Sequence, residues 1–363
     1  ANVELGDAKI SYDEYDSLHD LYKRNFQLFI EYNIKDVELI LRLDDKLKLF
    51  ELALTLAYDT KSNFEDVFAQ TRMWDSLCYS NLLNKKIIVP PKEVKEKDSA
   101  FEGAYVKEVQ VGMHQWVASF DLNSLYPHLL MQYNISPETL IEPADYTDEM
   151  RRIISSGVNV NKMLNKQIDT SGLSGVTLTP NGQFFRTDFR GFLPQMMDDM
   201  YNDRKKFKKL MLQAKQEYEN ETNPAKKQEL QKLISRYDNL QLAKKVSLNS
   251  AYGALGSQYF RFYDLRQALA VTQAGQLSIR WIENKLNAYM NKLLKTENKD
   301  YVIASDTDSI YLNLGPLVNT ITQPNSEVTK VISIMDKICE DKIQPFIDKS
   351  YKELADYVHA YDQ

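Results

Sequence analysis

The sequence predicts an α+β fold, in which a few short strands are combined with long helices. Three observations support this prediction. Apolar residues recur at helical spacing over residues 17–58, two apolar strand-like stretches flank the polar segment 305–309, and strand-like and helical stretches do not alternate regularly. Regular alternation would predict a doubly wound parallel sheet, so the irregular order favours α+β.

The first elements are predicted to be helices over residues 17–58. Leu18 and Leu21 begin a helical pattern that continues through DVELILRLDDKLKLFELALTLAY. Between residues 85 and 120 the pattern changes to short strand-like stretches separated by prolines and charged residues. We place the domain boundary in this transition, near residues 90–100.

The middle of the chain predicts a small hairpin and then a long helical hairpin. Residues 144–190 begin with a helical stretch, YTDEMRRIISS, and continue with turns and a β-hairpin in TSGLSGVTLTPNG. Pro194 suits the first turn of a helix, and no Gly or Pro follows it before ETNPAKK. A second helical stretch over residues 227–251 would return antiparallel, so the two would form a projecting helical hairpin.

The last elements are a long helix, a β-hairpin and further helices. DLRQALAVTQAGQLSIRWIENKLNAYMNKLL predicts the helix, YVIASDTDSIYLNL predicts the hairpin, and residues 327–359 are predicted to be helical.

The composition excludes several classes of protein. The chain has 363 residues, of which 43% are hydrophobic and 26% charged, as in globular proteins of two or three structural units. Its two cysteines, Cys78 and Cys339, and its four histidines do not match a disulfide framework or a zinc site. The sequence contains no bilayer-spanning stretch and no signal-peptide pattern, so we expect a reducing, cytoplasmic setting without membrane contact.

The charge is unevenly distributed. The net charge is −6, but the segment from Arg204 to Lys245 contains twelve Lys and Arg residues and only five Asp and Glu residues. This segment is therefore a candidate for contact with a polyanion. A solvated helix face with i,i+4 ion pairs is the alternative interpretation.

The segment SDTDS carries the most distinctive acidic pair. Asp306 and Asp308 lie two residues apart between apolar strands, so on extended backbone they would point to the same side. Two carboxylates placed together repel each other, and a divalent cation would relieve this repulsion. The alternative is a polar turn without a ligand.

Asp121 ends a third apolar strand, in WVASFDLNSLYP. A strand-end Asp is often only a cap or turn residue. Together with Asp306 and Asp308, however, it forms a set of hard oxygen ligands that suits Mg²⁺ or Mn²⁺. Paired ions of this kind, roughly 3.5–4 Å apart, support in-line phosphoryl transfer.

The predicted helical hairpin adds a polar and cationic face. Lys245, Asn249 and Tyr252 share one helix face, while Gly253 and Gly256 leave room for close approach.

Arg204 and Lys208 lie one turn apart on the other arm. With antiparallel arms, three cations would converge near the base of the hairpin, where a triphosphate would fit. Arg204 and Lys208 are surrounded by further lysines, so a solvated surface is the alternative.

Three motifs in this order, DLNSLYP (121–127), KKVSLNSAYG (244–253) and DTDS (306–309), resemble the polymerase motifs of family B DNA polymerases. The wider phrases YNISPETL, RFYDLR and SDTDSIY are similar to those of the replicative polymerases of T-even-type bacteriophages. The resemblance covers nearly the whole chain.

The resemblance implies a fold and a reaction. The fold would be an antiparallel-sheet palm with a helical-hairpin fingers insertion and an N-terminal helical remnant of a 3′–5′ exonuclease domain. The reaction would be two-metal, template-directed transfer of a deoxynucleotide to a primer 3′-OH, with Mg²⁺, or Mn²⁺ in its place, as cofactor. Primer–template DNA and dNTPs would be the partners, in the cytoplasm of a phage-infected bacterial cell, and a sliding clamp and other replisome proteins would bind through parts that this chain lacks.

The resemblance also implies residue roles. Asp121 and Asp308 would bridge the metals, the carbonyl group of Leu122 would be a further ligand, and Asp306 would support the metal geometry. The backbone N–H groups of Ser124, Leu125 and Tyr126 would bind the triphosphate. The cationic side chains of Arg204, Lys208 and Lys245 would bind it as well. The Tyr126 ring would exclude a 2′-OH, and the base-pair pocket would be shaped by Asn249, Tyr252 and Gly253.

The chain departs from the family pattern in places. Phe101 stands where the family usually has Tyr, and Ser305 where Gly is common. Only Tyr32 and Asp36 match the exonuclease motifs, so we expect no complete exonuclease site. From the resemblance we also expect this chain to lack the basic primer-grip segment and the thumb.

The resemblance implies five segments and leaves one question open. They are the exonuclease remnant (1–50), part of an N-terminal domain or linker (51–95), the first palm part (96–190), the fingers (191–257) and the second palm part (258–363). We expect a truncated chain. The alternatives are a subunit of a split polymerase, inactive until a separate polypeptide supplies thumb and exonuclease, and a purely structural relic.

Overall fold

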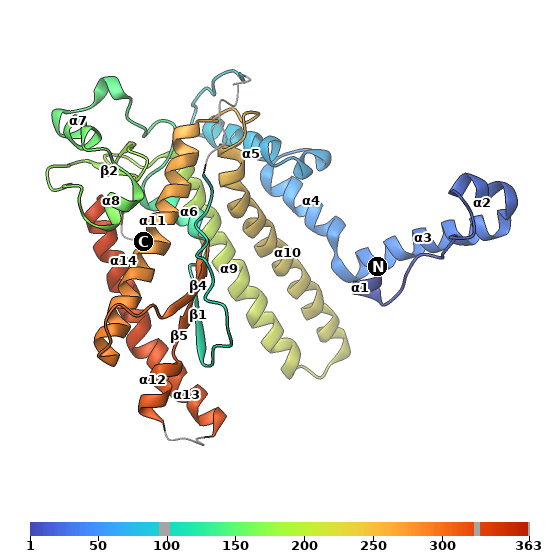
Figure 1. The fold of residues 1–363 in the computed structure, drawn as a ribbon. Coiled ribbons are helices and arrows are strands. Elements are labelled where there is room, and N and C mark those ends of the chain that lie inside the picture. The colour runs from blue at the N-terminus through green and yellow to red at the C-terminus, as the bar shows by residue number, and fades with distance from the viewer. Residues whose placement is uncertain (94–101, 323–326, 362–363) are drawn as a thin grey trace. The chain divides into compact units, whose positions relative to one another are not determined.

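A computed structural model describes residues 1–93, 102–322 and 327–361 (Figure 1). Over these ranges the chain is mainly helical with short antiparallel strands, which agrees with the predicted α+β class. It divides into two compact units, Ala1–Ala69 with Phe207–Ala243, and Gln70–Lys206 with Lys244–Gln363. None of the helices in the described ranges combines the length and the apolar character needed to cross a bilayer.

The first unit contains the predicted N-terminal helices. Its elements before residue 70 are α1 (Asn2–Leu5), α2 (Leu18–Arg24), α3 (Phe26–Leu47), α4 (Leu49–Thr60) and the 3₁₀-helix η1 (Phe64–Phe68). Helix α2 begins at an N-cap, because the Ser17 hydroxyl accepts a hydrogen bond of 3.1 Å from the backbone N–H of Asp20. Helices over residues 17–58 are thereby confirmed.

The predicted helical hairpin is also present. Helix α9 (Phe192–Asn220) and helix α10 (Pro224–Leu255) are joined by a three-residue turn and run side by side (Figure 1). Pro224 begins α10, where its missing N–H costs no helical hydrogen bond. The outer parts of both helices belong to the first unit, where Met211, Ala214 and Ile234 are buried together.

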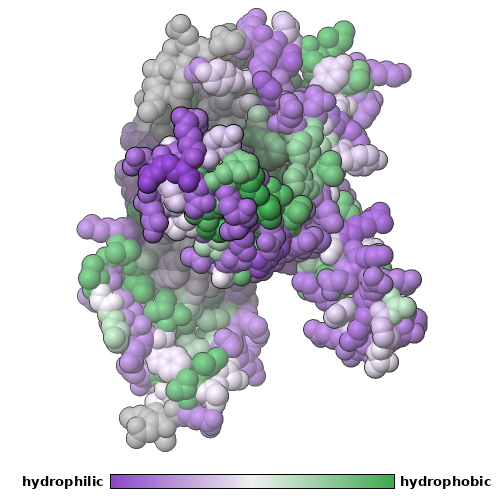
Figure 2. All heavy atoms as spheres, turned by 90° about the vertical axis from the view of Figure 1, so that its right-hand side faces the viewer, coloured by the Kyte–Doolittle hydropathy of each residue, from purple (hydrophilic) through white to green (hydrophobic). Residues whose placement is uncertain are grey.

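One face of α3 is apolar and exposed. Phe26, Ile34, Val37, Ile40 and Leu41 each have more than half of their surface exposed. At 100° per residue they fall within one arc of the helix. On the face of the molecule drawn in Figure 2, hydrophobic residues likewise gather within a largely hydrophilic surface.

The second unit is built on a three-stranded antiparallel sheet. Its strands are β1 (Val117–Asp121), β4 (Val302–Asp306) and β5 (Ser309–Asn313), with β5 in the centre. In the register, Asp121 and Asp306 both pair with Ser309, one from each side. The predicted hairpin at 301–314 is therefore confirmed, and the end of β1 lies beside its turn.

Helices and a second small sheet surround this sheet. They are α5 (Gln70–Asn84), α6 (Leu125–Gln132), η2 (Pro143–Asp145), α7 (Asp148–Ser155), α8 (Val160–Leu164), the hairpin β2 (Val176–Leu178) and β3 (Phe184–Arg186), α11 (Leu265–Leu294), α12 (Gly315–Ile321), α13 (Val328–Ile338), the π-helix η3 (Cys339–Ile343) and α14 (Gln344–Val358). Apolar side chains of α11, among them Ile282 and Leu286, are buried with Val302 and Ile310 of the sheet. This core fixes the sheet on which the acidic residues lie.

The strand-like expectation for residues 85–120 is largely wrong. Within the described part of this range the only extended element is β1, together with a single bridge between Val106 and Asp306. The N–H of Lys107 donates to the carbonyl of Ser305, and that of Gln110 to the carbonyl of Ile303. The four residues 107–110 thus lie opposite the three residues 303–305, a bulge that interrupts the ladder. Phe101 and most of the boundary predicted at 90–100 lie outside the described residues.

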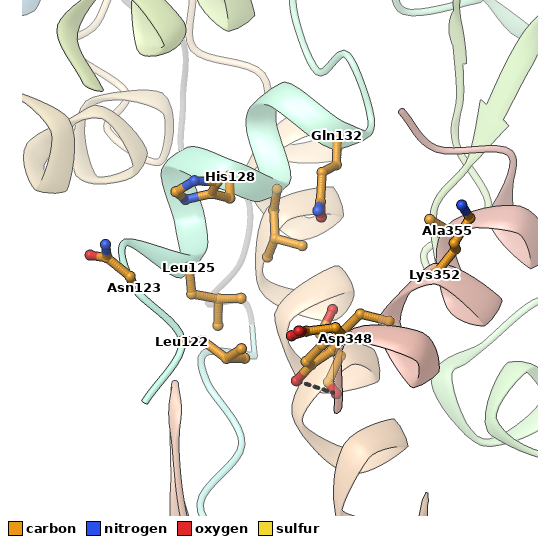
Figure 3. Close-up of a pocket in the computed structure, with 11 residues that line it drawn as sticks. Leu122, Asn123, Leu125, His128, Gln132, Asp348, Lys352 and Ala355 are labelled. Carbon is orange, nitrogen blue, oxygen red and sulfur yellow. Dashed lines mark hydrogen bonds between the residues drawn. The ribbon is translucent and has the colours of Figure 1, made fainter. Parts of the chain in front are cut away.

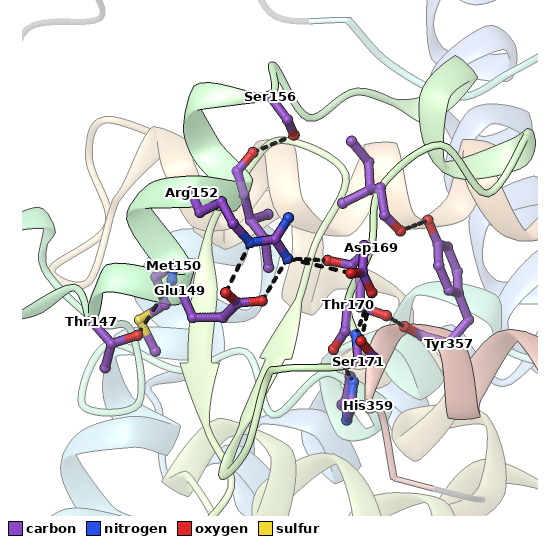
Figure 4. Close-up of polar contacts among 12 residues, drawn as sticks. Thr147, Glu149, Met150, Arg152, Ser156, Asp169, Thr170, Ser171, Tyr357 and His359 are labelled. Atoms are coloured by element: carbon purple, nitrogen blue, oxygen red, sulfur yellow. Dashed lines mark hydrogen bonds and ion pairs between the residues drawn. The ribbon is translucent and has the colours of Figure 1, made fainter.

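Polar contacts fasten the end of α14 to the segment between α8 and β2 (Figure 4). The Thr170 hydroxyl donates to the carbonyl of Tyr357 at 2.7 Å, and the Tyr357 hydroxyl donates to the carbonyl of Ile168 at 2.9 Å. On the same segment, the backbone carbonyl of Asp169 accepts a hydrogen bond of 3.0 Å from the Arg152 guanidinium of α7. Helices α7 and α14 are thereby tied to one loop.

Candidate functional site

The turn between β4 and β5 carries the predicted acidic pair. Asp306 ends β4 and is exposed, whereas Asp308 lies in the turn and is half-buried. The backbone N–H of Leu122 donates to the carbonyl of Asp308 at 2.8 Å. This bond holds the residue after Asp121 against the turn, so the three carboxylates predicted from two separate motifs lie at one edge of the sheet.

The expectation that Asp306 and Asp308 share one side of an extended strand is wrong. Thr307, between them, is in the left-handed region with φ 54°, and its side chain donates to the Asp306 carboxylate at 2.9 Å. A two-residue turn needs such a conformation, so strand alternation does not apply there. Asp308 faces the cavity that Asp121 also lines, and Asp306 is not among the lining residues.

The electrostatics of Asp308 suit a cation. Burial raises the pKa of Asp308 above its ordinary value, and the negative charges of Asp121 and Asp306 raise it further. Oxygen donors around a site of excess negative charge match the ligands that Mg²⁺ and Mn²⁺ prefer. Across the residues described, no group of three or more His, Cys, Asp or Glu side chains is arranged to hold a metal by itself.

A cavity of about 460 Å³ joins the acidic edge to the cationic helices. It is lined by Asp121, Asn123, Ser124, Leu125, Tyr126, Pro127, Arg204, Lys245, Asn249, Thr307 and Asp308. Residues from β1, α6, α9, α10 and the β4–β5 turn therefore meet around one space, all within the second unit.

The cationic side of this cavity comes from the base of the helical hairpin. The Arg204 guanidinium donates to the Ser124 hydroxyl at 3.2 Å. Lys244, next to Lys245, forms an ion pair of 3.2 Å with Asp203 across the two helices. Lys208, one turn beyond Arg204, belongs to the first unit, so its convergence with the other two cations stays a prediction.

Tyr126 is packed against two residues of the neighbouring helices. Its ring centroid lies 4.8 Å from that of Tyr252, and a Cβ atom on Gly275 would come within 3.2 Å of its Cε1 atom. Burial raises the pKa of Tyr126, and burial together with Tyr126 raises the pKa of Tyr252 to about 12, so both phenols stay neutral at pH 7.

Gly253 lies close to a side chain of helix α5. A Cβ atom there would come within 3.0 Å of the side-chain oxygen of Gln70 in α5. The space left by Gly253 is thus used by this unit's own helix.

Several site residues were missed by the sequence analysis. Asn123 and Thr307 line the cavity, and Gly275 makes room for Tyr126. For Gly275 a signal existed, because an isolated glycine inside a long helical pattern is unfavourable and often marks close packing. Asn123 and Thr307 carry no such signal.

The two residues that match an exonuclease motif lie on α3. The Asp36 carboxylate forms an ion pair of 2.8 Å with Lys9, and the Tyr32 ring packs edge-on against Tyr12. Both contacts are local to the first unit.

A second cavity of about 310 Å³ lies beside the first (Figure 3). Asn123 and Leu125 line both cavities, and the second is completed by residues of α6, α11 and α14, including His128, Gln132 and Asp348. The start of α6 therefore lies between the two cavities.

Acidic strand ends and the cations of a helical hairpin thus line one cavity. Comparison with known proteins gives the class. Residues 67–354 match the model of DNA polymerase family B. The chain belongs to this family.

Individual relatives agree with this assignment. The chain is 29% identical to the DNA-directed DNA polymerase of Escherichia phage RB69 and 30% identical to that of Enterobacteria phage T4, in each case over 99% of this chain and 42% of the relative. It is 31% identical to the DNA polymerase delta catalytic subunit of Schizosaccharomyces pombe over 78% of this chain and 24% of that protein. The chain therefore spans less than half the length of these relatives.

Proposed function

We propose that this chain is the palm and fingers part of a phage DNA-directed DNA polymerase, which transfers a template-selected deoxynucleotide to a primer 3′-OH. The observation that supports this most is the single cavity lined by Asp121 and Asp308 on one side and by Arg204 and Lys245 on the other. Family membership supplies the reaction class, and both phage relatives carry the name DNA-directed DNA polymerase.

The segments follow from this proposal. Residues 96–190 and 258–363 form the palm, and residues 191–257 form the fingers. Residues 1–50 correspond to the end of an exonuclease domain, and residues 51–95 to part of an N-terminal domain.

In the proposed reaction the acidic edge would hold the divalent ions. The Asp121 and Asp308 carboxylates and the carbonyl of Leu122 would be the ligands, and Asp306 would support them from the neighbouring strand end. Mg²⁺ bound there would polarise the attacking hydroxyl and would offset the negative charge of the phosphates. Burial and the negative charge of Asp121 raise the pKa of Asp308, so its own negative charge is unfavourable without a nearby cation. This edge is therefore suited to binding cations.

The chain's own residues position the nucleotide. The first N–H groups of α6, from Ser124 to Tyr126, have no partner within the helix and would donate to phosphate oxygens. Arg204, Lys208 and Lys245 would neutralise charge on the triphosphate as it redistributes.

The sugar and base of the nucleotide would meet the ring side of the cavity. The Tyr126 ring, held between Tyr252 and Gly275, would lie under the sugar and exclude a 2′-OH. Asn249, Tyr252 and Gly253 would shape the space for the new base pair.

Single-nucleotide primer extension tests this proposal. The wild type is compared with Asp121→Asn/Asp308→Asn in Mg²⁺ or Mn²⁺ at low salt. Asp336→Asn/Asp341→Asn, which changes two acidic residues outside the cavity, is the matched control. We expect incorporation by the wild type and by the control, and none by the cavity variant.

Incorporation by the cavity variant would contradict the proposed metal site. If the wild type incorporated no nucleotide alone but did so with a second polypeptide that carries the remaining length of the relatives, the chain would instead be one subunit of a split polymerase.

A further inference from the structure

The corner between β1 and α6 has an unusual backbone. Ser124 adopts the left-handed conformation, with φ 55° and ψ 50°, immediately before α6 begins. Residues other than glycine rarely adopt this conformation without support from their surroundings. Both Asn123 and Ser124 line the cavity, so whatever supports this corner also shapes the site.

Helix α9 contacts this corner at two points. The Asn123 amide nitrogen donates to the Tyr201 hydroxyl at 3.2 Å, and the Arg204 guanidinium donates to the Ser124 hydroxyl at 3.2 Å. The Ser124 hydroxyl in turn donates to the Asn123 side-chain oxygen at 3.3 Å. Because Tyr201 and Arg204 lie three residues apart on α9, the three hydrogen bonds and this helical turn form a closed ring of contacts around Asn123 and Ser124.

His128 completes the support from the side of α6. Its Nδ1 atom lies 3.0 Å from the carbonyl oxygen of Ser124. Its ring packs edge-on against Tyr201, with the ring centroids 4.7 Å apart. The Tyr201 ring makes a further contact within α9, where the Lys205 ammonium lies 5.4 Å from the ring centroid. Tyr201 is thus fixed by α6 as well as by its own helix.

We propose that Tyr201 and His128 are positioning residues, which hold the Asn123–Ser124 corner and so set the separation between Arg204 and the N–H groups at the start of α6. Neither of the two lines the cavity that Asp121 and Asp308 line, so they act on it through Asn123 and Ser124. This inference rests on the proposed function, because the nucleotide is the ligand that the corner would serve.

A double-mutant cycle tests the inference. Steady-state incorporation is measured for the wild type, Tyr201→Phe, Asn123→Ala and the combination. Tyr201→Phe keeps the ring and its contact with His128 but removes the hydroxyl that accepts the Asn123 bond. A single neutral hydrogen bond corresponds to roughly a 2- to 10-fold effect, so we expect KM for the incoming dNTP to rise by about that factor while kcat changes less than twofold.

The cycle distinguishes positioning from packing. If Tyr201 acts through Asn123, its hydroxyl has no further effect on KM once Asn123 is alanine. Tyr218→Phe, on the same helix but packed among apolar residues of the first unit, is the matched control and should leave KM unchanged. A second variant, His128→Ala, should raise KM for the dNTP in the same way without changing the affinity for primer–template DNA.

An unchanged KM in Tyr201→Phe, or the same rise in the presence and absence of the Asn123 side chain, would overturn the inference. A rise in KM that is matched by weaker DNA binding would also overturn it, because that result indicates a general structural defect. Absence of incorporation in the wild type is a separate result, since it contradicts the proposed function before the corner is tested.

Discussion

At the residue scale, Asp308 occupies a position that favours ligand binding over stability. Burial and two neighbouring carboxylates raise its pKa, so its negative charge is held at a cost to the folded state. We therefore expect Asp308→Asn to abolish metal-dependent incorporation while the melting temperature stays equal or rises. Calorimetry and primer extension on the same preparation check both parts, and a lower melting temperature would mean that Asp308 stabilises the turn.

Tyr126 and Gly275 form a second residue-scale pair. Tyr126→Ala would open space beside the sugar, and we expect ribonucleotide acceptance relative to deoxynucleotide to increase by more than tenfold, about 1.4 kcal/mol in selectivity. Gly275→Ala would press on the same ring, since its new Cβ would lie 3.2 Å from Tyr126 Cε1. Competition between labelled dNTP and rNTP measures the ratio, and the proposed steric role of Tyr126 is excluded if Tyr126→Ala leaves it unchanged.

At the element scale, α3 offers adjacent positions with opposite surroundings. Leu39 is 3% exposed and Ile40 is 56% exposed. Replacing Leu39 with Asn removes a buried apolar side chain and buries an amide, which we expect to cost about 3 kcal/mol. Ile40→Asn should cost about 0.5 kcal/mol or less. Urea unfolding followed by circular dichroism compares them, and a large cost at Ile40 would show that this face is covered in solution.

Elements with strong local signals were predictable from the sequence. Helices α2 to α4 follow from apolar spacing, and the β4–β5 hairpin follows from two apolar strands around a polar turn. The strands expected before β1 failed because tertiary context, a bulge beside β4, decides the pairing there. Helix α5 and helix α12 were not predicted, and each contains polar residues among its apolar ones.

The site itself was only partly predictable. Asp121, Asp308, Arg204 and Lys245 were found because charged residues next to apolar strands and helices are conspicuous. Their meeting depends on the pairing of β1 with β5, which joins residues separated by more than half of the chain. Tyr201 gave no signal, because an aromatic residue at helical spacing is equally compatible with core packing.

At the scale of the whole molecule, one ion network joins three parts of the second unit. The Lys107 ammonium lies 2.5 Å from Glu283 of α11 and 2.7 Å from Asp300, which precedes β4. Burial would raise the pKa of Asp300, but hydrogen bonds from Lys107 and Asn287 outweigh it and lower that pKa. A lowered pKa stabilises the folded state above the ordinary pKa and loses this contribution as the pH falls through the folded value.

Removing Lys107 should therefore have a pH-dependent cost. Lys107→Met leaves two carboxylates close together without their cation, which we expect to cost about 3 kcal/mol at pH 7. As the pH falls below the ordinary pKa of an aspartate and through the lowered pKa of Asp300, the wild type loses the contribution of the Lys107–Asp300 ion pair, so the difference should shrink. Lys285→Met is the control, because the ion pair between Lys285 of α11 and Glu353 of α14 is more exposed and should contribute less than about 1 kcal/mol.

Tryptophan fluorescence is the suitable probe for this comparison. All three tryptophans, Trp74, Trp116 and Trp281, belong to the second unit, so their signal follows the unfolding of the unit that holds the network. A cost of Lys107→Met that is the same at pH 7 and at a pH below the folded pKa of Asp300 would show that the lysine contributes through the packing of its aliphatic stem. In that case the segment before β1 would be held to the sheet by its backbone hydrogen bonds, and charge would have no part in fixing the edge that carries Asp306.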